Sequence, residues 1–195
     1  MSRETHLIQS DSLLRQSGLV LGGSLLIAIA AQVSVPMYPV PMTLQTLAIL
    51  LVGFALGSRL GALALVAYLA EGAMGLPVFA NGMSTAAFAG PTVGFLFGFI
   101  GLAWLAGFAA ENGMTRNVAT TAISAIVASA LLYIPGAIWP MFVASSFGIE
   151  AGWVGIGTDK IWAWFMAPFL LGDLVKAIVA ALIVTGAWKA LRKNA

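Results

Sequence analysis

Long runs of apolar residues, separated by short polar or Gly/Pro-rich stretches, make up most of the chain. Such runs predict membrane-spanning helices, because about 20 apolar residues cross the hydrocarbon core of a bilayer. The pattern contains six of them, at about residues 18–35, 42–56, 60–70, 92–110, 118–139 and 165–191. The second and third are short for a full crossing and are divided by Gly57-Ser58-Arg59. We expect an all-α integral membrane protein with about six transmembrane helices, and a count of five or seven stays open.

Composition supports a membrane protein without a separate soluble body. Hydrophobic residues make up 61% of the 195 residues and charged residues only 8%, whereas a soluble domain carries about 25% charged residues. So few charges cannot cover a core in water, and lipid is expected to cover much of the surface. Residues 1–195 are therefore expected to form a single transmembrane domain. The polar stretch before residue 18 lacks the apolar core of a signal peptide, so we expect the first run to stay in the membrane.

Basic residues predict the orientation of the chain, because cytoplasmic loops are enriched in Lys and Arg. When the ends and loops are assigned alternately to the two sides, one side has only Lys160. The other side has seven basic residues, which are Arg3, Arg15, Arg59, Arg116, Lys189, Arg192 and Lys193. We therefore expect a multi-pass protein of the cell inner (cytoplasmic) membrane. Its N-terminal segment 1–17 and its basic tail 189–195 are both expected in the cytoplasm.

Three connections are then expected on the outer face. They are the Pro-rich turn around Tyr38, the loop 71–90 and the Trp-rich stretch 140–164. All three are longer or more irregular than the turns on the cytoplasmic side. Irregular backbone in a membrane is tolerated where it is buried in protein or lines a cavity. This asymmetry predicts that a ligand is bound at the outer face.

Asp173 and Lys176 are charged residues inside the last apolar run, three positions apart. A charge at the bilayer centre costs about 2.5–3.5 kcal/mol on insertion scales, and such residues are functional by default. The spacing places both on one helix face. At about 1.5 Å rise per residue, Asp173 lies roughly 10 Å below an outer helix end near Met166. The pair predicts the floor of a pocket that opens to the outside, and a purely structural ion pair is the alternative.

Three further side chains are candidates near the outer face. Asn81, in the Pro- and Gly-bounded stretch 76–82, is able to bond a ligand or to cap its own turn, and the sequence favours neither. Gln45 begins the second run, where a glutamine faces a cavity or bonds a neighbouring helix, and the structural role is slightly favoured. Tyr38 fits an interfacial aromatic better than a binding residue.

Small residues recur every four positions at Gly90, Gly94 and Gly98. Stripes of this kind let helices approach closely. We expect internal packing at this stripe, and a partner protein in the membrane is the weaker alternative.

Several classes of function lack support in the sequence. The histidine His6 is the only one and lies in the polar N-terminal stretch, and there are no cysteines. Neither a His-Glu metal motif nor a phosphate-binding Gly-Lys-Ser/Thr sequence is present. We expect no metal, no cofactor and no nucleic-acid partner. An enzyme based on Asp173 and Lys176 alone is the least supported class.

An ordered set of motifs covers the chain from the second to the last run. They are Pro39-Val40-Pro41-Met42-Thr43-Leu44-Gln45-Thr46, Leu51-Val52-Gly53-Phe54-Ala55-Leu56-Gly57, Tyr68-Leu69-Ala70-Glu71-Gly72-Ala73-Met74-Gly75-Leu76-Pro77-Val78-Phe79, Gly90-Pro91-Thr92-Val93-Gly94-Phe95 and Gly172-Asp173-Leu174-Val175-Lys176. In these motifs the chain resembles the BioY family, the biotin-specific substrate-binding (S) components of energy-coupling factor transporters. The ordered set is specific, although each motif alone is weak.

The resemblance implies a six-helix component that captures biotin, its transported substrate, from outside. It also implies partners, namely a transmembrane coupling protein and cytoplasmic ATPases, besides the lipid bilayer. The family's ligand positions fall here on Asn81, Asp173 and Lys176. Asp173 would accept from a ureido N–H group, and Lys176 would donate to the ureido carbonyl or pair with the carboxylate. Candidate apolar walls are Phe79, Trp139 and Trp164.

Two other functions stay open at the level of sequence. One is an S component for a different vitamin or small heterocycle, and the other is a membrane scaffold with a structural Asp–Lys pair. The family often docks its coupling protein through Ala-x-x-x-Ala in the first helix. Here the first run has Gly18-x-x-x-Gly22 instead, so the docking surface is not predicted.

Overall fold

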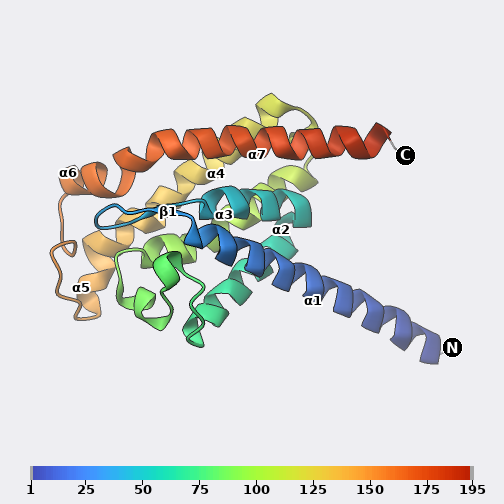
Figure 1. Ribbon diagram of the computed structural model, residues 1–195, viewed down its shortest axis with the longest axis horizontal. Coiled ribbons are helices and arrows are strands. Elements are labelled where there is room, and N and C mark those ends of the chain that lie inside the picture. Colours follow the sequence, from blue (N-terminus) through green and yellow to red (C-terminus); the bar gives the residue numbers. More distant parts are fainter. Residues whose placement is uncertain (1, 194–195) are drawn as a thin grey trace.

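The protein is a bundle of helices whose long connections gather at one end (Figure 1). The computed structural model describes the backbone of residues 2–193 and the side chains of residues 12–187, 189 and 190. The helices are α1 (Ser2–Gln32), α2 (Gln45–Ala73), α3 (Val93–Glu111), α4 (Val118–Ile138), α5 (Ala144–Ser146), α6 (Thr158–Ile161) and α7 (Ala167–Lys193). The first and last described residues both lie on the side opposite the long connections, well apart from each other (Figure 1).

The expectation of an all-α membrane protein is confirmed. Within the described residues, five helical stretches are long and apolar enough to cross a membrane. They are Ser12–Gln32, Gln45–Ala73, Val93–Glu111, Val118–Ser146 and Thr158–Ala187. Large apolar side chains are exposed along these helices, for example Leu14, Ile123 and Leu171. A surface of this kind is stable only where lipid covers it.

Helix α2 consists of two helical halves that fold back on each other at Gly57. The side-chain amide of Gln45 donates to the hydroxyl of Tyr68 at 2.7 Å. In a straight helix, residues 23 positions apart would be separated by about 34 Å along the axis. A Cβ atom on Gly61 would lie 3.1 Å from the Cα atom of Gly53. With both halves of α2 counted, the described bundle has six long helical segments. The predicted break at Gly57-Ser58-Arg59 is therefore where the chain reverses.

Gly57 adopts a backbone conformation that only glycine tolerates well, with φ 82° and ψ 176°. A Cβ atom here would also lie 2.6 Å from Oε1 of Glu111. That carboxylate caps the turn, since it accepts from the backbone N–H of Ser58 at 2.7 Å. We predict that Gly57→Ala destabilises the protein by about 1–3 kcal/mol. The apparent melting temperature in detergent measures this, with Gly22→Ala in an open stretch of α1 as control. Equal melting temperatures of the two variants would contradict the prediction.

Two segment boundaries differ from the sequence-based expectation. Helix α1 starts at Ser2 and ends at Gln32, whereas the first run was expected over 18–35. A polar composition does not prevent a helix from extending beyond the apolar run. The structure does not describe the side chains of Arg3, His6, Arg192 and Lys193. The charge-based prediction of orientation rests partly on these side chains and stays a prediction.

The expected long connection over 140–164 is wrong, because much of it is helical. A π-helical turn, Trp139–Val143, continues α4 into α5, and another, Trp162–Met166, joins α6 to α7. Pro140 is the second residue of the first π turn, and the helical backbone continues through it. The connection is therefore confined to the stretch between Ser146 and Thr158.

Helix α1 is the least buried of the long helices. Only 17% of its most apolar window is buried, against 33–44% for the other four. It leads directly into a two-stranded antiparallel ribbon, β1 (Ser34–Val35) and β2 (Met42–Thr43), in which Ser34 pairs with Thr43. The loop between these strands, residues 36–41, crosses the end of the bundle where the other long connections lie (Figure 1).

Candidate functional site

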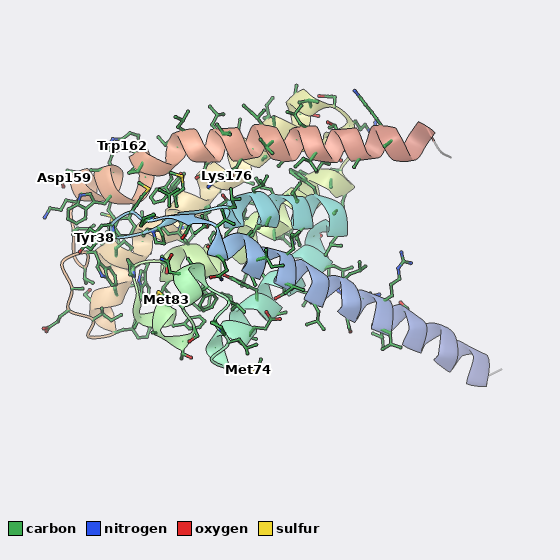
Figure 2. All side chains as sticks on the ribbon, in the orientation of Figure 1. Tyr38, Met74, Met83, Asp159, Trp162 and Lys176 are labelled. Carbon is green, nitrogen blue, oxygen red and sulfur yellow. The ribbon has the colours of Figure 1, made fainter. Side chains whose placement is uncertain are left out.

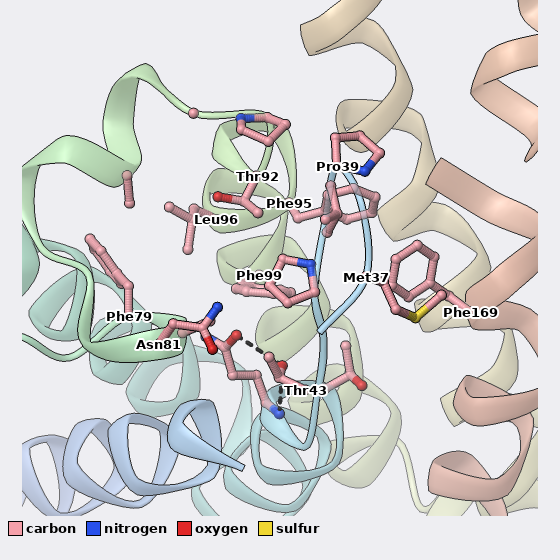
Figure 3. A pocket seen from close by; sticks show the side chains of 18 of the residues that line it. Met37, Pro39, Thr43, Phe79, Asn81, Thr92, Phe95, Leu96, Phe99 and Phe169 are labelled. Atoms are coloured by element: carbon pink, nitrogen blue, oxygen red, sulfur yellow. Dashed lines mark hydrogen bonds between the residues drawn. The ribbon is translucent and has the colours of Figure 1, made fainter. Parts of the chain in front are cut away.

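A cavity of about 270 Å³ lies beneath these connections. Its size is close to the lower end of small-molecule sites, which span about 300–1,000 Å³. Figure 3 shows Phe79 and Asn81 on one side of it, Phe169 on the other, and the 36–41 loop with Met37 and Pro39 across it. The remaining lining comes from the connection between α2 and α3, from the start of α2 and the residues before it, and from α3, α4 and α7.

The polar part of the cavity is an ion pair on α7 with two hydroxyl partners. Nζ of Lys176 lies 3.0 Å from Oδ1 of Asp173 and donates to Oγ1 of Thr46 at 3.0 Å. Thr46 donates to the same Oδ1 at 3.3 Å, and the hydroxyl of Tyr133 donates to Oδ2 of Asp173 at 2.6 Å. The cluster thus joins α2, α4 and α7.

Both charged side chains are held in place by hydrogen bonds and still have hydrogen-bonding positions for a ligand. The two side chains are only 10% and 11% exposed, and a buried pair is stable only when its remaining donors and acceptors are satisfied. Lys176 has three N–H donors, of which two are used within the described residues. Asp173 already accepts three hydrogen bonds of about four possible, so one donor of Lys176 and one acceptor position of Asp173 remain for a bound molecule.

Aromatic and aliphatic side chains form the rest of the lining. Phe79 is 2% exposed and packs edge-to-face on Tyr68 at 5.2 Å. Phe95 lies between Tyr133 and Phe169, with ring centroids 6.2 and 6.4 Å away. Because Phe169 precedes Asp173 by four residues, both project from the same face of α7. The cavity therefore combines a charged floor with apolar walls, as small-molecule sites commonly do.

Gln45 lines the cavity, but its amide is engaged with the protein. Its Oε1 accepts from Thr43 at 2.9 Å, and its Nε2 donates to Tyr68 at 2.7 Å. Tyr68 donates in turn to the carbonyl oxygen of Val78 at 3.1 Å. This chain of bonds links the start of α2 to the loop that carries Phe79, which fits the structural role favoured from sequence.

The structure brings five of the seven predicted site residues to the cavity. Those in the lining are Gln45, Phe79, Asn81, Asp173 and Lys176.

The predicted residues Tyr38 and Trp164, and the candidate wall Trp139, are not among the lining residues. Tyr38 is 70% exposed and packs edge-to-face on Trp164 at 6.0 Å. Trp139 donates from Nε1 to the carbonyl oxygen of Gly90 at 2.9 Å. These three residues hold the connections above the cavity. Figure 2 shows Tyr38 near the end of the bundle that carries Asp159 and Trp162, whereas Lys176 lies further along the bundle.

Sequence reasoning missed Thr46, Tyr133, Phe95 and Phe169. Their only signal was position, since Thr46 follows Gln45 in one motif and Phe169 lies one helical turn before Asp173. A hydroxyl group in an apolar run costs much less free energy in the membrane than a charge does, so Tyr133 did not stand out in the sequence.

The bundle and this cavity define an integral membrane protein with a cavity of small-molecule size that is lined by a buried ion pair and apolar walls. A family model, the BioY family, matches residues 2–193 of the chain. The biotin transporter BioY of Thermotoga maritima is 37% identical over 161 residues, which are 81% of this chain and 86% of that protein. The biotin transporter BioY of Rhizobium etli is 36% identical over 154 residues, or 77% and 79% of the two chains. The chain belongs to the BioY family, whose members are transporter components and not enzymes.

A solved structure shares the fold. The crystal structure of the S-component for biotin from an ECF-type ABC transporter matches with a TM-score of 0.74 at 24% identity. The match covers 92% of this chain and 93% of the other. The similarity therefore extends over nearly all of the chain.

Proposed function

We propose that this multi-pass membrane protein captures biotin at the outer face of the cytoplasmic membrane as the S component of an energy-coupling factor transporter. The observation that carries the proposal is the cavity with the Asp173–Lys176 pair at its floor. The names of the relatives support biotin as the ligand. Both ends of the described chain lie at the opposite end of the bundle (Figure 1), which fits cytoplasmic termini.

The chemistry of biotin suits this lining. Its ureido group has two N–H donors and one carbonyl acceptor, which match the carboxylate of Asp173 and the free donor of Lys176. Its thioether ring and aliphatic tail are apolar and match the walls around Phe95 and Phe169. Asn81 is exposed at the edge of the cavity, where it is able to bond a polar group that the floor does not take.

The partners belong to the same proposal. The sequence contains no phosphate-binding loop, so the energy for release into the cell has to come from other subunits. We propose a transmembrane coupling protein and cytoplasmic ATPases in that role. These would act on the side of the termini and of Arg59 and Arg116.

Isothermal titration of detergent-purified protein with biotin tests the substrate. We expect tight binding of biotin, and no measurable heat with thiamine or riboflavin at the same concentrations. Binding of a different vitamin would replace biotin as the substrate. No binding of any of them by folded, biotin-free protein would refute the proposal and favour a membrane scaffold.

A further inference from the structure

The turn that carries Asn81 is tied to the end of α1 by one side chain. Nε2 of Gln32 donates to the carbonyl oxygens of Phe79 at 3.1 Å and Val78 at 3.4 Å. Oε1 of Gln32 accepts from the backbone N–H of Gly82 at 3.1 Å. A single amide therefore spans both ends of the turn between Phe79 and Gly82.

Asn81 itself has a conformation that needs support. Its φ of 59° is left-handed, a region that asparagine tolerates better than most residues. The hydroxyl of Ser34, in β1, donates to Oδ1 of Asn81 at 2.8 Å. The side chain is thus fixed at its oxygen by the strand that follows α1.

The hydrogen bond from Ser34 places the amide oxygen of Asn81 toward β1, which leaves the NH2 group for the ligand. An asparagine side chain has one carbonyl oxygen and one NH2 group, which are chemically opposite. The oxygen of Asn81 is engaged by Ser34, and Nδ2 has no hydrogen-bond partner among the described residues. The group left for a molecule in the cavity is therefore a donor.

We propose that Ser34, in β1 just after α1, is a positioning residue that orients Asn81 to donate a hydrogen bond to an oxygen acceptor of the ligand. The inference rests on the proposed function and adds the direction of this bond. Biotin has two such acceptors, the ureido carbonyl and the carboxylate. Both share the chemistry that an NH2 donor recognises, and an acceptor-only side chain at this position would repel them.

Titration with biotin of the wild type, Ser34→Ala, Ser34→Thr and Asn81→Asp tests the proposal. We expect Ser34→Ala to weaken binding about fivefold, because one neutral hydrogen bond contributes about 1 kcal/mol. Ser34→Thr keeps the hydroxyl and should restore affinity to within about twofold. Asn81→Asp keeps the acceptor for Ser34 but loses the donor, so we expect a loss of at least about 30-fold. Ser145→Ala, whose hydroxyl bonds only Phe142 among the described residues, is the control.

A second ligand distinguishes the two acceptors. With biotin amide, whose tail carries no carboxylate, a loss on Asn81→Asp as large as with biotin identifies the ureido carbonyl, and a much smaller loss identifies the carboxylate. The proposal is overturned if Asn81→Asp binds biotin as the wild type does. It is also overturned if Ser34→Thr loses as much as Ser34→Ala at unchanged melting temperature. If the wild type itself fails to bind biotin, the proposed function has failed instead.

Discussion

Replacing Lys176 by methionine lowers the affinity for biotin by about 10- to 150-fold, since a hydrogen bond from a charged donor contributes about 1.5–3 kcal/mol and each 1.4 kcal/mol is a factor of about ten. Methionine keeps the length and the apolar stem of the side chain. It removes the donor that faces the ligand and leaves the carboxylate of Asp173 without its cation, 3.0 Å away. Isothermal titration of purified protein measures the loss.

Lys160→Met is the matched control for this variant. Lys160 lies outside the cavity lining, with its ammonium 5.5 Å from the ring centroid of Trp164, so we expect an affinity within about twofold of the wild type. Asp173 keeps its hydrogen bonds from Thr46 and Tyr133 in Lys176→Met, and we expect this variant to fold. A Lys176→Met protein that binds biotin normally but melts at lower temperature would show that the ion pair is structural.

Replacing Gly94 by alanine destabilises the bundle by about 1–3 kcal/mol, the usual cost of overpacking. A Cβ atom on Gly94 would clash with the carbonyl oxygen of Pro135 and lie 2.8 Å from Cβ of Trp139. Neither backbone can retreat without moving α3 away from α4. Because Phe95 and Tyr133 come from these two helices, we also expect weaker biotin binding. A thermal melt in detergent, followed by titration, measures both effects.

Gly101→Ala, on the same helix, is the control for Gly94→Ala. Nothing lies within 4 Å of a Cβ atom added at Gly101. Alanine is favoured over glycine in a helix by about 0.8–1.0 kcal/mol, so the control should melt at the same or a higher temperature. If both variants melt alike, the close packing of α3 on α4 at Gly94 does not limit stability.

Most of the fold was predictable from the sequence, because a bilayer allows few alternatives. A backbone in lipid has to satisfy its own hydrogen bonds, so each apolar run predicts a helix. The break at Gly57-Ser58-Arg59 was visible as a glycine beside polar residues in an apolar stretch. The helical continuation through Pro140 was not visible, because whether a proline ends or only begins a helical turn depends on the partners of the preceding carbonyl groups.

In the loop over residues 36–41, the sequence pattern does not decide which side chains face the cavity. Tyr38 was a candidate from its place in the Pro-rich turn, although an interfacial role was favoured, and its neighbours Met37 and Pro39 line the cavity whereas Tyr38 does not. The lining includes consecutive residues, namely Pro36 and Met37 and then 39–41, so the loop does not follow the alternation of an extended strand. Which face turns inward depends on the pairing of Ser34 with Thr43, and that pairing is a tertiary property of the loop.

The sequence by itself determined the membrane-helical class and singled out Asp173 and Lys176, because an apolar run bears charges only at a cost. Their partners were decided by the tertiary structure. Thr46 and Tyr133 lie 127 and 40 residues from Asp173 along the chain, and hydroxyl groups are inexpensive enough in a helix to leave no trace in the pattern. Only the packing of α2, α4 and α7 brings these hydroxyls to one carboxylate.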